Sequence, residues 1–572
     1  LYRVLPDPSG RYYGPGDSDQ NIWFGWRFGQ AFREWNLIPL RFEDMLVPFG
    51  FDVVLVDGYL PLWVSGWFNL IAPPVLAYNL TLSVIAMVNY FAFLAVARQA
   101  TSSRFVAMVA ALTTATAPVL MTRFTGHIQL ACAFTIALLF REALLTASGG
   151  LDGSTVARRS ARLAALVVIA FLCSVYFFFA GLAVYLLTLT LLGQLRKRYL
   201  LSVALAGLVV TAVLAPLALA RVGLERSERA ARTIEEQASR EVFYDVTTRV
   251  YSADILSVAI PSDPTLLSLG EAEFADLPRT GETLTFPGYV ALFALVAGAI
   301  VHHRFRVLVA VLALGTVAVS LGPILRFDGY EQAVFGDNVG YMPYELVRRM
   351  PVLDAMRAPS RFALALPPIA ALAIASLGDR ALAQFSWTRT RVGMCVIGLL
   401  AAGLSSVSIL DLVATDGLSI PHALEGIDER AKPEDAILVV PTDCRGIEVM
   451  YLHLQVSSRL PMVGCGPQFQ SLPWASELRP YLEHPSMTAL RCRPNDVAFY
   501  YGADRVAKHS AEIPDELQTA FGVRFLVVDL WALASDDCNG IEDHVSDLAE
   551  THETWAANER FAVIDLHHQV PG

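Results

Sequence analysis

The chain has 572 residues, of which 54% are hydrophobic and only 17% are charged, and its mean hydropathy is +0.46. Soluble domains carry about 25% charged residues, so this composition excludes an ordinary soluble enzyme, a disordered protein and a small disulfide scaffold. The formal net charge of −11 argues against nucleic acid as a partner, because phosphate binding needs concentrated lysine and arginine. The sequence predicts a polytopic α-helical membrane protein with substantial parts outside the bilayer.

Residues 1–72 precede the first long apolar run. Because the chain begins with Leu1 rather than Met and shows no signal peptide, we expect further residues before it, with room for one more spanning helix. Asp17 and Asp19 lie in a turn-rich stretch, followed by an aromatic amphipathic helix that suits the membrane–water interface. Carboxylates at that depth can take a proton from a hydroxyl nucleophile or bind a divalent cation such as Mg²⁺ or Mn²⁺. The competing interpretation is that one of the two aspartates caps the helix.

Apolar runs predict ten membrane spans, each long enough for the hydrocarbon core and almost free of charge. The spans are 74–97, 104–121, 127–147, 162–176, 178–194, 199–221, 287–302, 306–321, 361–378 and 391–411. The run from 161 to 194 is too long for one straight helix, so we expect it to fold back near Ser174, as two short spans or a re-entrant pair. An extra helix before Leu1 would bring the total to eleven.

Basic loops set the predicted orientation, because lysine and arginine collect on the cytoplasmic side. Five short loops are basic: 98–104, 141–162, 196–198, 302–306 and 380–391. They alternate with the other connections. The segments left on the outer side are 1–72, 222–286, 322–360 and the tail 412–572. This pattern predicts a multi-pass membrane protein. The Ala-, Leu- and Arg-rich composition indicates a bacterium, so the expected location is the bacterial inner membrane.

One of the outer connections holds a candidate ligand contact, and another is predicted to form a helix. His127 lies in a short turn, where it can bind a metal or a phosphate, although a lone interfacial histidine is more often merely tolerated. The loop 222–286 opens with charges at helical spacing, which indicates a solvated helix.

Four arginines gather at the end of the loop 322–360, just before the ninth span: Arg348, Arg349, Arg357 and Arg361. On the outer side they run against the charge rule. A lipid phosphate would explain them, because the arginine fork matches phosphate oxygens. The alternative is that they pair with acidic residues of the same loop.

The tail 412–572 changes to the composition of a soluble domain. Short β-branched runs at 436–440, 523–528 and 561–564 predict strands, and helical patterns occur near 420–431, 446–456, 514–521 and 540–556. A small α/β domain outside the membrane is therefore expected. Four cysteines of the tail allow two disulfides in an oxidising compartment, or four reduced thiols: Cys444, Cys465, Cys492 and Cys538.

Taken in order, these motifs resemble the membrane-embedded glycosyltransferases of superfamily C. The resemblance rests on residues 16–19 in the first outer segment, 73–79 entering a span, 126–127 in an outer turn, 350–362 before the ninth span, and the α/β tail. It covers most of the chain. The sequence lacks the WWD-type tail motif of oligosaccharyltransferases, which argues against transfer to asparagine.

The resemblance implies a sugar donor carried on a polyprenyl phosphate, and an acceptor that is an extracytoplasmic glycan, lipid or protein. Asp17 or Asp19 would be the catalytic base in a single displacement that inverts the anomeric centre. Arg357 and Arg361, with Arg349, would hold the lipid phosphate, and His127 would contact phosphate or metal. Some members of the superfamily need a divalent cation and others need none.

Two other functions stay open at this point. A transporter or flippase of lipid-linked substrates would carry polar groups at the bilayer midplane, whereas the predicted spans are almost free of charge. A non-catalytic envelope assembly protein would use the tail to bind partners. The donor sugar, the acceptor and the oligomeric state cannot be read from the sequence.

Overall fold

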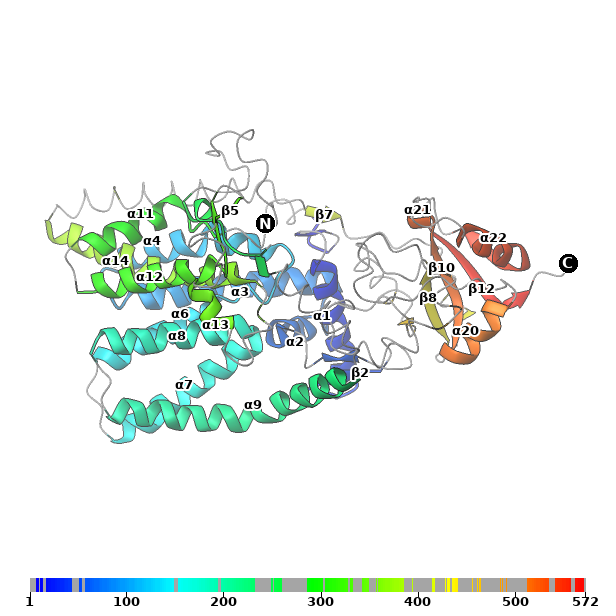
Figure 1. The fold of residues 1–572 in the computed structure, drawn as a ribbon, viewed down its shortest axis with the longest axis horizontal. Coiled ribbons are helices and arrows are strands. Elements are labelled where there is room, and N and C mark those ends of the chain that lie inside the picture. The colour runs from blue at the N-terminus through cyan, green and yellow to red at the C-terminus, as the bar shows by residue number, and fades with distance from the viewer. Residues whose placement is uncertain are drawn as a thin grey trace.

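The computed structural model has a bundle of helices at one end and a β-sheet at the other (Figure 1). It describes residues 7–9, 11–13, 17–43, 51–53, 57–148, 153–193, 197–231, 248–249, 251–259, 285–301, 304–327, 330–332, 342–348, 356, 358–384, 393, 414–416, 427, 430–432, 435–440, 455, 460, 462–463, 484, 486, 490, 512–533, 541–556 and 561–569.

The helices of the first two thirds of the chain are α1 (Asp17–Arg33), α2 (Tyr59–Phe68), α3 (Pro74–Ala97), α4 (Arg104–Ala115), α5 (Pro118–Met121), η2 (Thr122–Phe124), α6 (Phe134–Ser148), α7 (Gly153–Cys173), α8 (Val175–Leu191), α9 (Lys197–Ala231), η3 (Leu256–Val258), α11 (Tyr289–Ile300), α12 (Arg306–Ser320), α13 (Pro343–Arg348), η4 (Pro359–Ala365) and α14 (Leu366–Gln384). Short strands accompany them: β1 (Arg11–Tyr13), β2 (Arg41–Phe42), β3 (Phe51–Asp52), β4 (Leu325–Phe327) and β5 (Tyr330–Gln332). Here η denotes a 3₁₀ helix.

Two described segments, α3 and the continuous η4–α14, are long and apolar enough to cross a membrane. The count rises to three when α4 and the α5–η2 segment are taken as one span bent by 53°. This bend lies at Pro118, which lacks an N–H group and disfavours helical backbone at Ala117.

Four further apolar helices are shorter: Val175–Leu191, Leu200–Pro216, Tyr289–Ile300 and Arg306–Ser320. The last three fall within predicted spans, whereas the first begins three residues before the predicted span 178–194. The predicted span 391–411 lies almost wholly outside the described residues, so the number of ten stays a prediction. Two other boundaries differ from expectation. Residues 125–133 form turns, so the helix expected from 127 begins only at Phe134. Helix α9 continues to Ala231, since Glu and Arg at helical spacing extend it.

The centre of the bundle is α14. An 18-residue apolar stretch of the η4–α14 segment is 89% buried inside the protein. Helices α3, α4, α11 and α12 pack around α14. Burying an apolar helix on all sides is the arrangement expected when its whole circumference is hydrophobic.

Helices α7 and α8 are separate, as the sequence predicts. Ser174 between them has extended backbone, with φ −166°, and its side chain is buried. Together with α9, these helices form a second apolar cluster beside the main core.

The first two helices approach each other closely. A Cβ atom added to Gly66 of α2 would lie 2.6 Å from the Cβ of Phe28 in α1. Aromatic rings of the two helices meet edge to face, with the centroids of Phe32 and Trp63 5.9 Å apart. The α1–α2 pair therefore forms a tightly packed support for the start of α1.

The tail contains a five-stranded mixed sheet in the order β11-β12-β10-β8-β9. Its strands are β8 (Ala436–Val440), β9 (Met462–Val463), β10 (Val523–Asp529), β11 (His552–Ala556) and β12 (Phe561–Gln569), and its helices are α20 (Ile513–Phe521), α21 (Leu530–Leu533) and α22 (Ile541–Thr551). The parallel pair β8 and β10 is fully buried, as expected for a sheet covered on both faces.

The predicted strands at 436–440, 523–528 and 561–564 are present, and so is the predicted helix at 514–521. Residues 552–556 were expected to be helical but form β11, because Thr554 and Trp555 favour strands and pair with β12. The helices expected at 420–431 and 446–456 and the four tail cysteines lie largely outside the described residues. The domain boundary at 411 stays a prediction.

Candidate active site

The two aspartates lie in the first turn of α1, where a carboxylate is stabilised by the positive end of the helix dipole. Asp17 is the first helical residue, and 44% of its side chain is exposed. Asp19 is buried, with 4% exposure, and its Oδ1 accepts a hydrogen bond from the hydroxyl of Tyr12 in β1. The same turn of helix therefore presents one accessible and one buried carboxylate.

His127 meets Asp17. The Nδ1 atom of His127 lies 3.0 Å from Oδ2 of Asp17, and 18% of the imidazole is exposed. The turn that carries His127 is fixed from α1: Asn21 donates from Nδ2 to the carbonyl oxygen of Gly126 at 2.6 Å. Gly126 has φ +105°, a conformation that favours glycine. The structure thus places His127 beside one of the two predicted aspartates, Asp17.

Tyr12 is a part of the site that the sequence did not reveal. Its side chain is buried, and burial together with the nearby Asp19 raises the pKa of its hydroxyl well above the usual value. The hydroxyl therefore stays protonated and keeps donating to the Asp19 carboxylate.

The arginine cluster is described only in part. Arg349 and Arg357 lie outside the described residues, whereas Arg361 lies in η4 and is partly buried. Its guanidinium carbon stands 4.9 Å from the ring centroid of Tyr176, close to the start of α8. The Tyr176 hydroxyl accepts a hydrogen bond from the backbone N–H of Ala358 at 3.0 Å.

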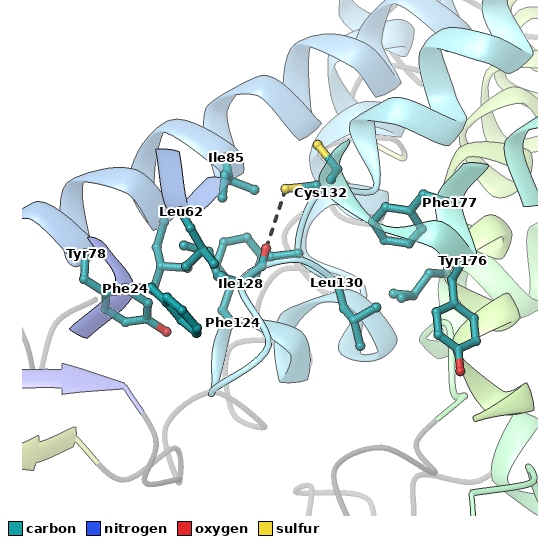
Figure 2. Packing of buried hydrophobic residues seen from close by; sticks show 14 of the residues in the cluster. Phe24, Leu62, Tyr78, Ile85, Phe124, Ile128, Leu130, Cys132, Tyr176 and Phe177 are labelled. Atoms are coloured by element: carbon teal, nitrogen blue, oxygen red, sulfur yellow. Dashed lines mark hydrogen bonds between the residues drawn. The ribbon is translucent and has the colours of Figure 1, made fainter. Parts of the chain in front are cut away.

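The segment that precedes His127 also contacts the element that carries Arg361. Helix α5, just before that turn, packs against η4, which carries Arg361. Figure 2 shows the turn, with Phe124, Ile128 and Leu130, lying between Tyr78 on one side and Tyr176 on the other. Arg361 therefore lies on an element that packs against α5, and α5 precedes the turn that carries His127.

Asp57 is a second residue that the sequence did not single out. Its Oδ1 accepts from the N–H of Val175 at 3.1 Å, and its Oδ2 accepts from Ser174 Oγ at 3.0 Å. The Asp57-Gly58 pair just before α2 is a turn signal that could have marked it.

The sequence also names Asp17, Asp19 and His127 as possible contacts of a divalent cation. In the part of the chain that the structure describes, no three His, Cys, Asp or Glu side chains are grouped so that they could hold a metal. Asp17 and His127 offer two ligands, and Asp19 is occupied by Tyr12. Binding of a cation by these residues therefore stays an expectation from the sequence.

Solved structures show which fold the chain shares. ArnT from Cupriavidus metallidurans, bound to undecaprenyl phosphate, is 12% identical with a TM-score of 0.50, over 98% of this chain and 95% of that one. A variant of the arabinofuranosyltransferase AftD from Mycobacteria is 14% identical with a TM-score of 0.51, over 97% of this chain and 40% of that one. The chain therefore shares the fold of these two proteins.

Comparison of the sequence with known proteins and families identifies one family. No curated protein matches the chain. A family profile described as a domain of unknown function, DUF6311, matches residues 4–410, which include every candidate site residue and all but the last residue of the predicted spans. The chain belongs to the DUF6311 family.

Proposed function

We propose that the chain is a glycosyltransferase that moves a sugar from a polyprenyl-phosphate donor to an extracytoplasmic glycan, lipid or protein. The transfer is a single displacement that inverts the anomeric centre. The fold shared with ArnT, which was solved with undecaprenyl phosphate, and with the arabinofuranosyltransferase AftD supports this class of reaction.

The observation that carries the proposal is the half-exposed carboxylate of Asp17 beside His127. A base must reach the acceptor hydroxyl, and Asp17 has the exposure for it. Asp19 is buried and receives the Tyr12 hydroxyl, so we assign it a structural role. Of the two aspartates, Asp17 is therefore the catalytic base, and His127 holds its carboxylate in place.

The leaving group in this reaction is the lipid phosphate. A polyprenyl chain cannot leave the bilayer cheaply, so its phosphate stays at headgroup depth. Arg361, backed by the Tyr176 ring, is the cation we assign to that phosphate, and Arg349 and Arg357 are proposed to join it. Positive charge placed where negative charge develops lowers the barrier to transfer.

The setting proposed for this reaction is the outer face of a bacterial inner membrane, with the chain multi-pass and residues 412–572 forming an extracytoplasmic α/β domain. A requirement for Mg²⁺ or Mn²⁺ stays an expectation from the sequence. Assays with EDTA, and with each metal added back, test it directly.

The decisive experiment compares Asp17→Asn with Glu34→Gln, a matched loss of one carboxylate from an exposed residue just after α1. The full chain in liposomes is given undecaprenyl-phosphate pentoses, hexoses and aminosugars together with an extract of bacterial envelope glycans, lipids and proteins as acceptors. The acceptor-dependent release of undecaprenyl phosphate is measured. Asp17→Asn is expected to lower the rate about 100-fold or more, as for the loss of a general base, with unchanged thermal unfolding. Glu34→Gln should behave as wild type. Full activity in Asp17→Asn would refute the assignment.

A further inference from the structure

The turn before α2 touches both sides of the candidate site. Asp57 binds the start of α8 through two oxygens, at 3.1 Å from the N–H of Val175 and 3.0 Å from Ser174 Oγ. The next residue, Gly58, has φ +97°, and a Cβ atom there would lie 2.6 Å from the Cβ of Gln129. The Asp57-Gly58 turn thus contacts the start of α8 on one side and the turn that carries His127 on the other.

The start of α8 is a place where backbone groups need partners. Ser174 is extended and buried, and the first N–H groups of α8 cannot find partners inside the helix. A carboxylate at this end satisfies Val175 and is favoured by the helix dipole. Asp57 therefore fixes where α8 begins, although it lies 117 residues earlier than Ser174.

Tyr176, the residue after Val175, contacts Arg361. Tyr176 receives the N–H of Ala358 on its hydroxyl, and the Arg361 guanidinium stands over its ring at 4.9 Å. Its ring also packs edge to face with Phe362. A shift or rotation at the start of α8 would move the Tyr176 ring, and with it the surface on which Arg361 rests.

We infer that Asp57 is a positioning residue: by holding Ser174 and Val175 it sets Tyr176, and Tyr176 orients Arg361 toward an anionic phosphate. This inference rests on the proposed function in one respect, the identity of the ligand as a polyprenyl phosphate. Asp57 does not touch the substrate, and its effect passes through Arg361.

A double-mutant cycle tests this coupling. The dissociation constant of undecaprenyl phosphate is measured by native mass spectrometry for the wild type, Asp57→Ala, Arg361→Ala and the double variant. Each single variant should bind about tenfold more weakly, a step of about 1.4 kcal/mol. The double variant should bind no more weakly than Arg361→Ala alone, because Asp57 acts through that arginine. An additive loss of about 100-fold, or wild-type affinity in Asp57→Ala, overturns the inference.

Two control variants distinguish a loss of positioning from a general folding defect. Asp57→Asn keeps an acceptor oxygen for Val175 and should recover most of the affinity. Glu43→Gln removes an exposed carboxylate from the same N-terminal segment and should bind as wild type. If Asp57→Ala does not fold, Ser174→Ala replaces it in the cycle with the same expected coupling.

A ligand-free measurement separates this inference from the proposed function. Hydrogen–deuterium exchange should rise in Asp57→Ala at the first amides of α8, where Phe177 and Phe178 bond to the Ser174 carbonyl, and not in α6. If the wild type binds no undecaprenyl phosphate, the proposed donor is wrong, and the exchange result alone judges the role of Asp57. Unchanged exchange at the start of α8 refutes that role.

Discussion

Two carboxylates in one helical turn differ because of what surrounds them. Asp19 is buried against Tyr12, and a buried carboxylate is tolerated only with donors that replace water. Asp17 keeps contact with solvent and faces His127. Spacing in the sequence could not separate the two residues, because the distinction comes from β1, which packs over one side of the turn.

Replacing Tyr12 with Phe should destabilise the protein, because it removes a donor from the buried Asp19 carboxylate. A lost bond of this kind costs about 1–3 kcal/mol, which corresponds to a drop of a few degrees in the melting temperature. Tyr59→Phe is the comparison, because its hydroxyl donates to the neutral carbonyl of Pro39 and should cost less. Equal melting temperatures for wild type and Tyr12→Phe would contradict the role given to Asp19.

The same pair has a dependence on pH. The pKa of Tyr12 is raised in the folded protein by burial and by Asp19, so the unfolded chain loses this proton first. The stabilisation is present below the unfolded pKa of about 10 and is lost as the pH rises above it. The difference in melting temperature between wild type and Tyr12→Phe should therefore shrink at high pH.

At the scale of elements, α1 keeps its place by packing against α2 through glycine. Gly66 leaves room for Phe28, and Arg33 donates from its guanidinium to the Asn69 carbonyl at 2.7 Å. The orientation of Asp17 therefore depends on a helix contact far from the chemistry.

Gly66→Ala should push α1 away from α2, since the new Cβ atom would stand 2.6 Å from Phe28. Overpacking of this kind costs about 1–3 kcal/mol, and we expect a lower melting temperature together with slower sugar transfer. Gly207→Ala in α9 is the matched control, because nothing lies within 4 Å of the added Cβ. Alanine at position 207 should leave the rate of sugar transfer unchanged. It should leave the melting temperature unchanged or raise it slightly, because alanine has a higher helix propensity than glycine.

Some helices and turns could be predicted from the sequence and others could not. Apolar runs located α3 and the break at Ser174 correctly, because length and hydrophobicity act locally. They placed the turn at 126–127 but began the next helix at 127, whereas the turns continue to 133 and depend in part on contacts with α1, such as the bond from Asn21 to Gly126. Asp57 was missed for the same reason: its partners at the start of α8 are distant in the chain.

At the scale of the whole molecule, the tail is tied to the N-terminal segment. Strand β1 pairs antiparallel with β7 (Ala414–Asp416), which places Tyr12 opposite Thr415. Trp23, in the second turn of α1, donates from its indole nitrogen to Gln455 Oε1 at 2.8 Å, and both side chains are fully buried. Residues after the bundle therefore touch α1 and the strand that carries Tyr12, on either side of the candidate base.

These contacts predict that the tail supports the site. Gln455→Ala leaves the buried indole N–H of Trp23 without this acceptor, at a cost of about 1–3 kcal/mol. We expect a lower melting temperature, faster proteolytic release of the tail and slower sugar transfer, since α1 carries Asp17. Glu550→Gln, an exposed change in α22, should alter none of the three. If Gln455→Ala frees the tail yet leaves transfer at the wild-type rate, the tail is separable from catalysis and the link through α1 carries no function.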